Sequence, residues 1–122
     1  MSEIRANTIS DAAGTGPIDL HKQSAAKAWV NFNGTGTIAI VDSFSVASLT
    51  DIGTGNYEVN FSNNMSSVGY APQICSNAAV SNYGFNRTGT FNTTAKVNVA
   101  HYENNTTVDT SQIYISAHGD LA

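Results

Sequence analysis

Apolar and polar residues alternate along much of this chain with the period of two that half-buried β-strands require. The alternation starts in residues 28–32, AWVNF, which combine β-branched, aromatic and small side chains. Residues 33–36, NGTG, tolerate positive φ, and residues 37–41 return to an apolar run. Two such runs on either side of an Asn- and Gly-containing turn predict a β-hairpin.

The residues after this hairpin predict further strands in close succession. Asp42 and Ser43 form a break, and residues 44–49 then alternate as a third strand should. We therefore expect the core to begin as a three-stranded meander. After a turn with two glycines at residues 52–56, residues 57–61 alternate apolar and polar side chains and predict a half-buried strand.

The second half of the chain contains shorter and less regular runs. Residues 68–71 predict a short strand ended by Pro72, which cannot donate to a ladder and marks an edge or a turn. Residues 84–94, rich in Gly, Asn and Thr, predict a long loop or a hairpin tip. Residues 96–102 and 113–117 alternate clearly and predict two more strands.

The pattern as a whole predicts an all-β protein with almost no helix. About seven or eight short strands, with turn signals roughly every eight to twelve residues, are typical of an antiparallel β-sandwich or a jelly-roll-like barrel. At 122 residues the chain fits one domain with a single core.

The N-terminal segment, residues 1–27, differs from the rest of the chain. Its aliphatic residues are isolated by polar and Gly-rich spacers, so they cannot form a core by themselves. They need a surface to rest on, either the domain or a neighbouring subunit. We therefore expect an extended attachment arm over residues 1–27 and a β-sandwich domain over residues 28–122. The arm's contact residues would be Ile4, Ile9, Ile18 and Leu20.

Composition narrows the classes of partner. Charged residues make up 11% of the chain, against about 25% in an average domain, and Asn, Ser and Thr take their place. The net charge is −4, and the five Lys and Arg residues do not cluster, which argues against nucleic acid. A polar, nearly uncharged surface suits a particle exterior or a carbohydrate-facing surface.

Residues that could support chemistry are few and scattered. His21, His101 and His118 lack metal-ligand spacing, and no Gly-x-Ser-x-Gly elbow is present, so we expect no metal, no cofactor and no enzymatic activity. The single cysteine, Cys75, is expected to be a half-buried strand thiol. The N-terminus lacks the pattern of a secretory signal and no stretch is long enough for a membrane span, so synthesis in a cytoplasm is expected.

The aromatic and aliphatic residues of the first hairpin predict a surface that must be covered. Trp29 points away from the face that Ala28, Val30 and Phe32 fill, and residues 38–41 are apolar on both faces. A sheet that is apolar on both faces must have both covered, either by a second sheet of the same domain together with the arm or by another subunit. The candidate subunit interface is therefore Trp29, Ala39 and Val41.

The predicted loop is the candidate recognition surface. Aromatic and amide side chains together suit recognition of a host-surface glycan, although aromatic residues on strands are more often packed in the core. The candidate residues at this exposed tip are Tyr83, Phe85, Asn86, Arg87 and Phe91.

Two sequence blocks carry a resemblance to a known family. Residues 28–36, AWVNFNGTG, and residues 50–61, TDIGTGNYEVNF, resemble the blocks AWVNFNGTG and TDxGTGxYxVNF of a small β-domain family of tailed bacteriophages. Members are usually described as tail-fibre or other virion structural proteins. The rest of the chain matches this family only in character.

The resemblance implies a structural protein of the virion. Its most direct form is a homotrimeric tail-fibre or receptor-binding appendage for host attachment, with the arm joined to a tail hub or baseplate. The alternative is a capsid decoration (cement) protein whose arm braces the major capsid protein of the head shell.

Overall fold

The computed structural model describes residues 25–77, 82–86 and 92–122, the second of these ranges by its backbone. This part of the chain is all-β and contains no helix. Its nine strands are β1 (Ala28–Asn33), β2 (Ala39–Phe44), β3 (Val46–Gly53), β4 (Asn56–Phe61), β5 (Ala71–Ser76), β6 (Asn82–Asn86), β7 (Lys96–Glu103), β8 (Thr106–Thr107) and β9 (Ile113–His118). The all-β prediction is therefore confirmed, with slightly more strands than expected.

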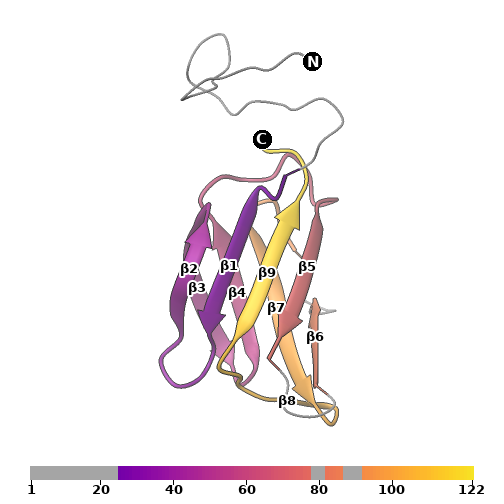
Figure 1. Ribbon diagram of the computed structural model, residues 1–122. Coiled ribbons are helices and arrows are strands. Elements are labelled where there is room, and N and C mark those ends of the chain that lie inside the picture. The colour runs from indigo at the N-terminus through magenta and orange to yellow at the C-terminus, as the bar shows by residue number, and fades with distance from the viewer. Residues whose placement is uncertain (1–24, 78–81, 87–91) are drawn as a thin grey trace, which may run out of the picture.

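The strands form two antiparallel sheets that face each other as a β-sandwich (Figure 1). The front sheet has the order β2-β1-β9-β5. The back sheet has the order β3-β4-β7-β6, and the two-residue strand β8 pairs with β7. Because β1 and β9 occupy the centre of the front sheet, the beginning and the end of the domain are hydrogen-bonded neighbours.

Alternate residues of both sheets fill the space between them. In β4 and β9 the buried residues occur at every second position, as the alternation predicted. The core consists of Ala28, Val30, Phe32, Tyr57, Val59, Phe61, Met65, Tyr70, Val97, Val99, Ile113, Ile115 and Ala117. Two edge-to-face ring pairs, Phe32 with Tyr57 and Phe61 with Tyr70, join strands and loops across this core.

The first hairpin is confirmed, but the three-stranded meander is wrong. Strand β2 continues through Asp42 and Ser43 to Phe44, and the chain then turns at Ser45 into β3, which belongs to the back sheet. Ser45 adopts a positive φ of 56°. Asp42 is accommodated within β2 because it pairs with Asn31 on the solvent-facing side of an edge strand. The break therefore lies at Ser45.

The predicted strand at residues 68–71 is also wrong. The strand is β5, which begins at Ala71 and includes Pro72. Because β5 is an edge strand of the front sheet, the missing N–H of Pro72 is tolerated, so the predicted edge position is confirmed. Cys75 lies on β5 as a strand residue but is exposed, where a half-buried thiol was expected. Residues 84–86, expected in a loop, belong to β6.

Both ends of the domain lie at one end of the sandwich (Figure 1). The Lys27 N–H donates to the carbonyl of Ala117 at 2.8 Å, beside the first residue of β1. The C-terminal residues leave the sheet and pair with the loop after β4, where the Ala122 N–H donates to Asn64 at 2.9 Å. The arm residues Ile4, Ile9, Ile18 and Leu20 lie outside the described residues.

Candidate functional site

The outer face of the front sheet is built by the residues of β1, β9 and β5 that point away from the core. Strand registers place these residues in two rows that cross the sheet. The first row is Gln73, Ser116, Trp29 and Phe44, and the second is Cys75, Tyr114, Asn31 and Asp42. Each row therefore combines an aromatic side chain with amide or hydroxyl groups.

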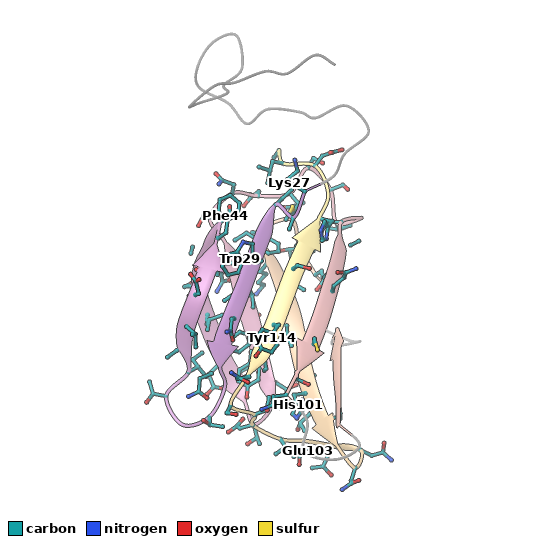
Figure 2. The ribbon with its side chains drawn as sticks, in the orientation of Figure 1. Lys27, Trp29, Phe44, His101, Glu103 and Tyr114 are labelled. Carbon is teal, nitrogen blue, oxygen red and sulfur yellow. The ribbon has the colours of Figure 1, made fainter. Side chains whose placement is uncertain are left out.

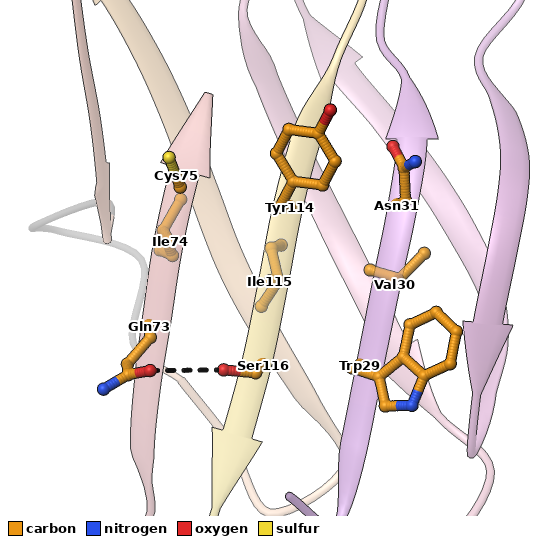
Figure 3. A pocket seen from close by; sticks show the side chains of 9 residues that line it. All are labelled: Trp29, Val30, Asn31, Gln73, Ile74, Cys75, Tyr114, Ile115 and Ser116. Atoms are coloured by element: carbon orange, nitrogen blue, oxygen red, sulfur yellow. Dashed lines mark hydrogen bonds between the residues drawn. The ribbon is translucent and has the colours of Figure 1, made fainter. Parts of the chain in front are cut away.

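A shallow groove of about 370 Å³ lies on this face between side chains of the two rows, and we call it the front groove (Figure 3). Its walls and floor are Trp29, Val30, Asn31, Gln73, Ile74, Cys75, Tyr114, Ile115 and Ser116. None of these nine residues is an Asp, Glu, Lys, Arg or His. The front groove is therefore a neutral surface with apolar and hydrogen-bonding groups side by side.

Two aromatic rings stand at different corners of the front groove. Trp29 on β1 is 37% exposed and Tyr114 on β9 is 39% exposed, so each ring keeps part of its surface open to a ligand. Trp29 pairs with Ser116 and Tyr114 pairs with Asn31, which sets the two rings on a diagonal across neighbouring strands (Figures 2 and 3). The backbone ladder of two central strands holds this arrangement.

The polar groups of the front groove are poorly satisfied within the domain. The Oδ1 atom of Asn31 is buried and has no hydrogen-bond partner among the described residues. The Ser116 hydroxyl donates to Oε1 of Gln73 at 3.5 Å, which is a long and weak contact. A buried acceptor without a donor costs about 1–3 kcal/mol, so the Asn31 side chain is held in the groove wall at a cost to stability.

The outer face of the back sheet differs, because its polar side chains bond to one another. The Asn60 amide donates to hydroxyl groups of Ser48 at 3.2 Å and Thr50 at 3.1 Å. Lys96 Nζ lies 2.6 Å from Glu58 Oε1 on the adjacent strand. This contrast makes the front groove, and not the back sheet, the candidate functional site.

A second polar arrangement connects the two sheets at the other end of the sandwich from Lys27 (Figure 2). The fully buried His101 on β7 has Nδ1 2.8 Å from the Ser76 hydroxyl of β5 and Nε2 3.5 Å from Glu103 Oε1. A serine, histidine and carboxylate in contact resemble a nucleophile and its base. Because the His101 ring has no exposed surface, this arrangement supports packing of β5 against β7 and offers no route to a substrate.

The predicted interface residues are all exposed, but they do not form one patch. Trp29 lines the front groove, whereas Ala39 pairs with Asn33 at the far end of β2. Val41 is the extra residue of a β-bulge opposite Asn31 and Phe32, and it is 64% exposed. The structure therefore separates Trp29 from the two candidates on the edge strand.

The predicted recognition loop is not part of the front groove. Tyr83, Phe85 and Asn86 belong to β6, an edge strand of the back sheet, and Arg87 and Phe91 lie outside the described residues.

Sequence reasoning placed Trp29 on the outer face, but it did not join Asn31, Gln73 and Tyr114 to it in one candidate site. Alternation in residues 113–117 already directed Tyr114 outward, but nothing local indicated that β9 pairs with β1.

Among residues 25–77, 82–86 and 92–122 there is no group of three or more His, Cys, Asp and Glu side chains that could hold a metal ion. The same residues contain no helix with the length and hydropathy needed to cross a membrane. Comparison of the chain with models of protein families, with curated proteins and with solved structures finds no match in any of the three.

Proposed function

We propose that this chain is a structural protein of a bacteriophage virion and that its β-sandwich is the binding domain of a trimeric tail-fibre or receptor-binding appendage. The observation that carries the proposal is the front groove, an uncharged surface with two partly exposed aromatic rings. The blocks at residues 28–36 and 50–61, which resemble a tailed-phage family, supply the virion context.

The position of the groove suits a module that is attached at one end. Strand β1 begins at the end of the sandwich where the C-terminus also lies, and residues 1–27 come directly before it in the sequence (Figure 1). The groove opens on the outer face of the front sheet, with Trp29 toward this end and Tyr114 farther from it (Figure 2). Attachment of the arm, through Ile4, Ile9, Ile18 and Leu20, to a tail hub or baseplate would thus leave the groove free for the host surface.

The trimer is proposed from the edge of the front sheet. Strand β2 has an exposed, largely apolar edge with Ile40, Val41 and Phe44. Apolar residues on an unprotected edge strand favour contact with another chain. We propose that neighbouring subunits cover β2, with Ala39 and Val41 in the contact.

Electron microscopy of virions labelled with a specific antibody tests the function. We expect the label at the tail, together with a light-scattering mass near three chains for the purified protein. Label over the head shell in high copy number would instead support a capsid decoration protein. Virions that bind no label would overturn the proposal in both forms.

A further inference from the structure

We propose that the front groove is a binding site for neutral carbohydrate, with Trp29 and Tyr114 as stacking surfaces and Asn31 and Gln73 as hydrogen-bonding groups. This inference rests on the proposed function, for which it supplies the chemical class of the receptor. In this proposal Trp29 contacts a ligand and not another subunit, and the contacts between subunits are made by β2.

The two aromatic rings have the placement that a sugar chain requires. Sugar rings carry flat apolar C–H faces, which aromatic side chains bury well while their polar atoms stay solvated. Trp29 and Tyr114 are diagonal neighbours on β1 and β9, a relation that separates residues by roughly 7–8 Å. At this spacing, two adjacent units of an oligosaccharide can each contact one ring.

The hydrogen-bonding groups match hydroxyl ligands. A hydroxyl donates and accepts, so a sugar hydroxyl can pair with the amide of Asn31, which lines the groove and whose Oδ1 has no partner among the described residues. The weak 3.5 Å contact between Ser116 and Gln73 leaves the Gln73 amide available for a second hydroxyl. A purely apolar occupant would satisfy neither group and would increase the cost of burying them.

Charge restricts the sugar to the neutral class. The described residues that line the groove include no cation to pair with a carboxylate or sulfate. Asp42 lies next to Asn31 in the same cross-strand row, so its carboxylate would repel an acidic sugar at the rim. A neutral glycan avoids both penalties.

The sequence provides a direct reporter, because Trp29 is the only tryptophan of the chain. The full-length protein is titrated with cellopentaose, maltopentaose and chitopentaose, each up to about 10 mM, since open grooves bind single oligosaccharides weakly. We expect a saturable change in tryptophan fluorescence with at least one of these sugars. We expect none with a pentamer of galacturonic acid.

Matched variants locate the binding. Tyr114→Phe keeps the ring and should keep the affinity, whereas Tyr114→Ala should weaken binding by about tenfold or more. Val68→Ala, at a residue that is 62% exposed and outside the groove, should bind as the parent does. Circular dichroism checks that each variant is folded. Isothermal titration, which needs no fluorophore, should show binding by the parent and binding weaker by about tenfold or more for Trp29→Ala.

The inference is overturned if no neutral sugar gives a saturable change, if the acidic pentamer binds equally well, or if Tyr114→Ala binds as tightly as Tyr114→Phe. Its failure is distinguishable from that of the proposed function. If the antibody labels virions but the purified protein binds no sugar, only the glycan site is rejected. If the protein binds a sugar but the antibody labels no virion, the virion role is rejected.

Discussion

At the scale of single residues, Tyr57 connects the core to two loops. Its ring is fully buried against Phe32, and its hydroxyl donates to the Gly34 carbonyl at 2.8 Å and lies 3.0 Å from Asp109 Oδ1. Asp109 also accepts the Gly55 N–H at 2.6 Å. Burial, followed by the nearby Asp109 carboxylate, raises the pKa of Tyr57 well above its ordinary value.

Replacement of Tyr57 by Phe tests this role. The change leaves the Gly34 carbonyl without its hydroxyl donor and removes the polar contact with Asp109, so we expect the free energy of unfolding to fall by about 1–2 kcal/mol. Urea denaturation measures it. Tyr114→Phe is the matched control, because Tyr114 is 39% exposed, and should change stability by less than about 0.5 kcal/mol. Equal losses in both variants would contradict the assignment.

Ionisation of the Tyr70 hydroxyl should destabilise the domain at alkaline pH. Burial raises the pKa of Tyr70 to about 12, and its hydroxyl donates to the Lys96 carbonyl at 2.8 Å. The unfolded chain then loses this proton at lower pH than the folded one. The contribution to stability is therefore complete below about pH 10 and is lost as pH rises toward 12.

Urea denaturation of the parent and Tyr70→Phe at a series of pH values measures this contribution. Stability of the parent should fall across the alkaline range, and the fall should be smaller in Tyr70→Phe. Because Tyr57 shifts in the same direction, part of the slope should persist in that variant. Parallel curves for the two proteins would show that Tyr70 does not titrate as described.

At the scale of elements, the corner at Ser45 directs the chain from the front sheet to the back sheet. Ser45 has a φ of 56°, its carbonyl accepts the Ser62 N–H at 3.0 Å, and its hydroxyl accepts from the Asn63 amide at 3.3 Å. A side chain at such a backbone conformation costs free energy, and a β-branched one costs most.

Replacement of Ser45 by Gly and by Val should therefore change the free energy of unfolding in opposite directions. Ser45→Gly removes the strained Cβ, so we expect the free energy of unfolding to stay the same or rise by up to about 1 kcal/mol. Ser45→Val should lower it by about 1–3 kcal/mol. Thermal and urea unfolding of both variants measure the difference. A Val variant as stable as the Gly variant would disprove the role of backbone strain here.

Local sequence patterns predicted the positions of the strands far better than they predicted which strands pair with one another. Alternation identified β4 and β9, and the Asn104-Asn105 turn before β8 has the positive φ values that its residue types favour. The turn at Ser45 has no glycine or proline to mark it, so the break was placed at Asp42 and Ser43 and β3 was assigned to the wrong sheet.

The candidate site, too, could be predicted only as far as the pattern of a single strand allowed. Trp29 could be placed on the outer face from its own strand, because the residues on either side of it are core residues. Gln73, Asn31 and Tyr114 join it only through the pairing of β1, β9 and β5. That register depends on contacts between segments far apart in the chain, which no local pattern contains.

At the scale of the whole molecule, the edge of β2 should decide the oligomeric state. Val41→Lys puts a charge on the exposed bulge, which a free edge tolerates and a buried interface does not. We expect light scattering to give about three chains for the parent and one for Val41→Lys, with unchanged circular dichroism. Val68→Lys, at a similarly exposed valine, should remain trimeric. A parent protein that is already monomeric would rule out the trimer.

The proposed attachment arm gives a separate prediction, which concerns incorporation into virions. Deletion of residues 1–20 leaves all of the described strands intact, since β1 begins at Ala28. We expect the truncated protein to fold, with the unfolding midpoint of the parent, but not to join virions. Antibody labelling of particles grown with each form measures incorporation. Normal incorporation of the truncated form would show that attachment lies in the β-sandwich.

The pairing of β1 with β9 also determines how the domain bears mechanical load. The bond from Lys27 to Ala117 closes the end of the sandwich where β1 begins and β9 ends. A force that pulls residues 27 and 118 apart would act on the hydrogen bonds of this ladder one after another, as a zipper opens. Force that enters through residue 27 and leaves through a ligand in the groove would instead act on β1 and on the strands of the same sheet that line the groove, β9 and β5. We therefore expect the domain to yield at lower force when it is pulled between residues 27 and 118 than when a ligand in the groove bears the load.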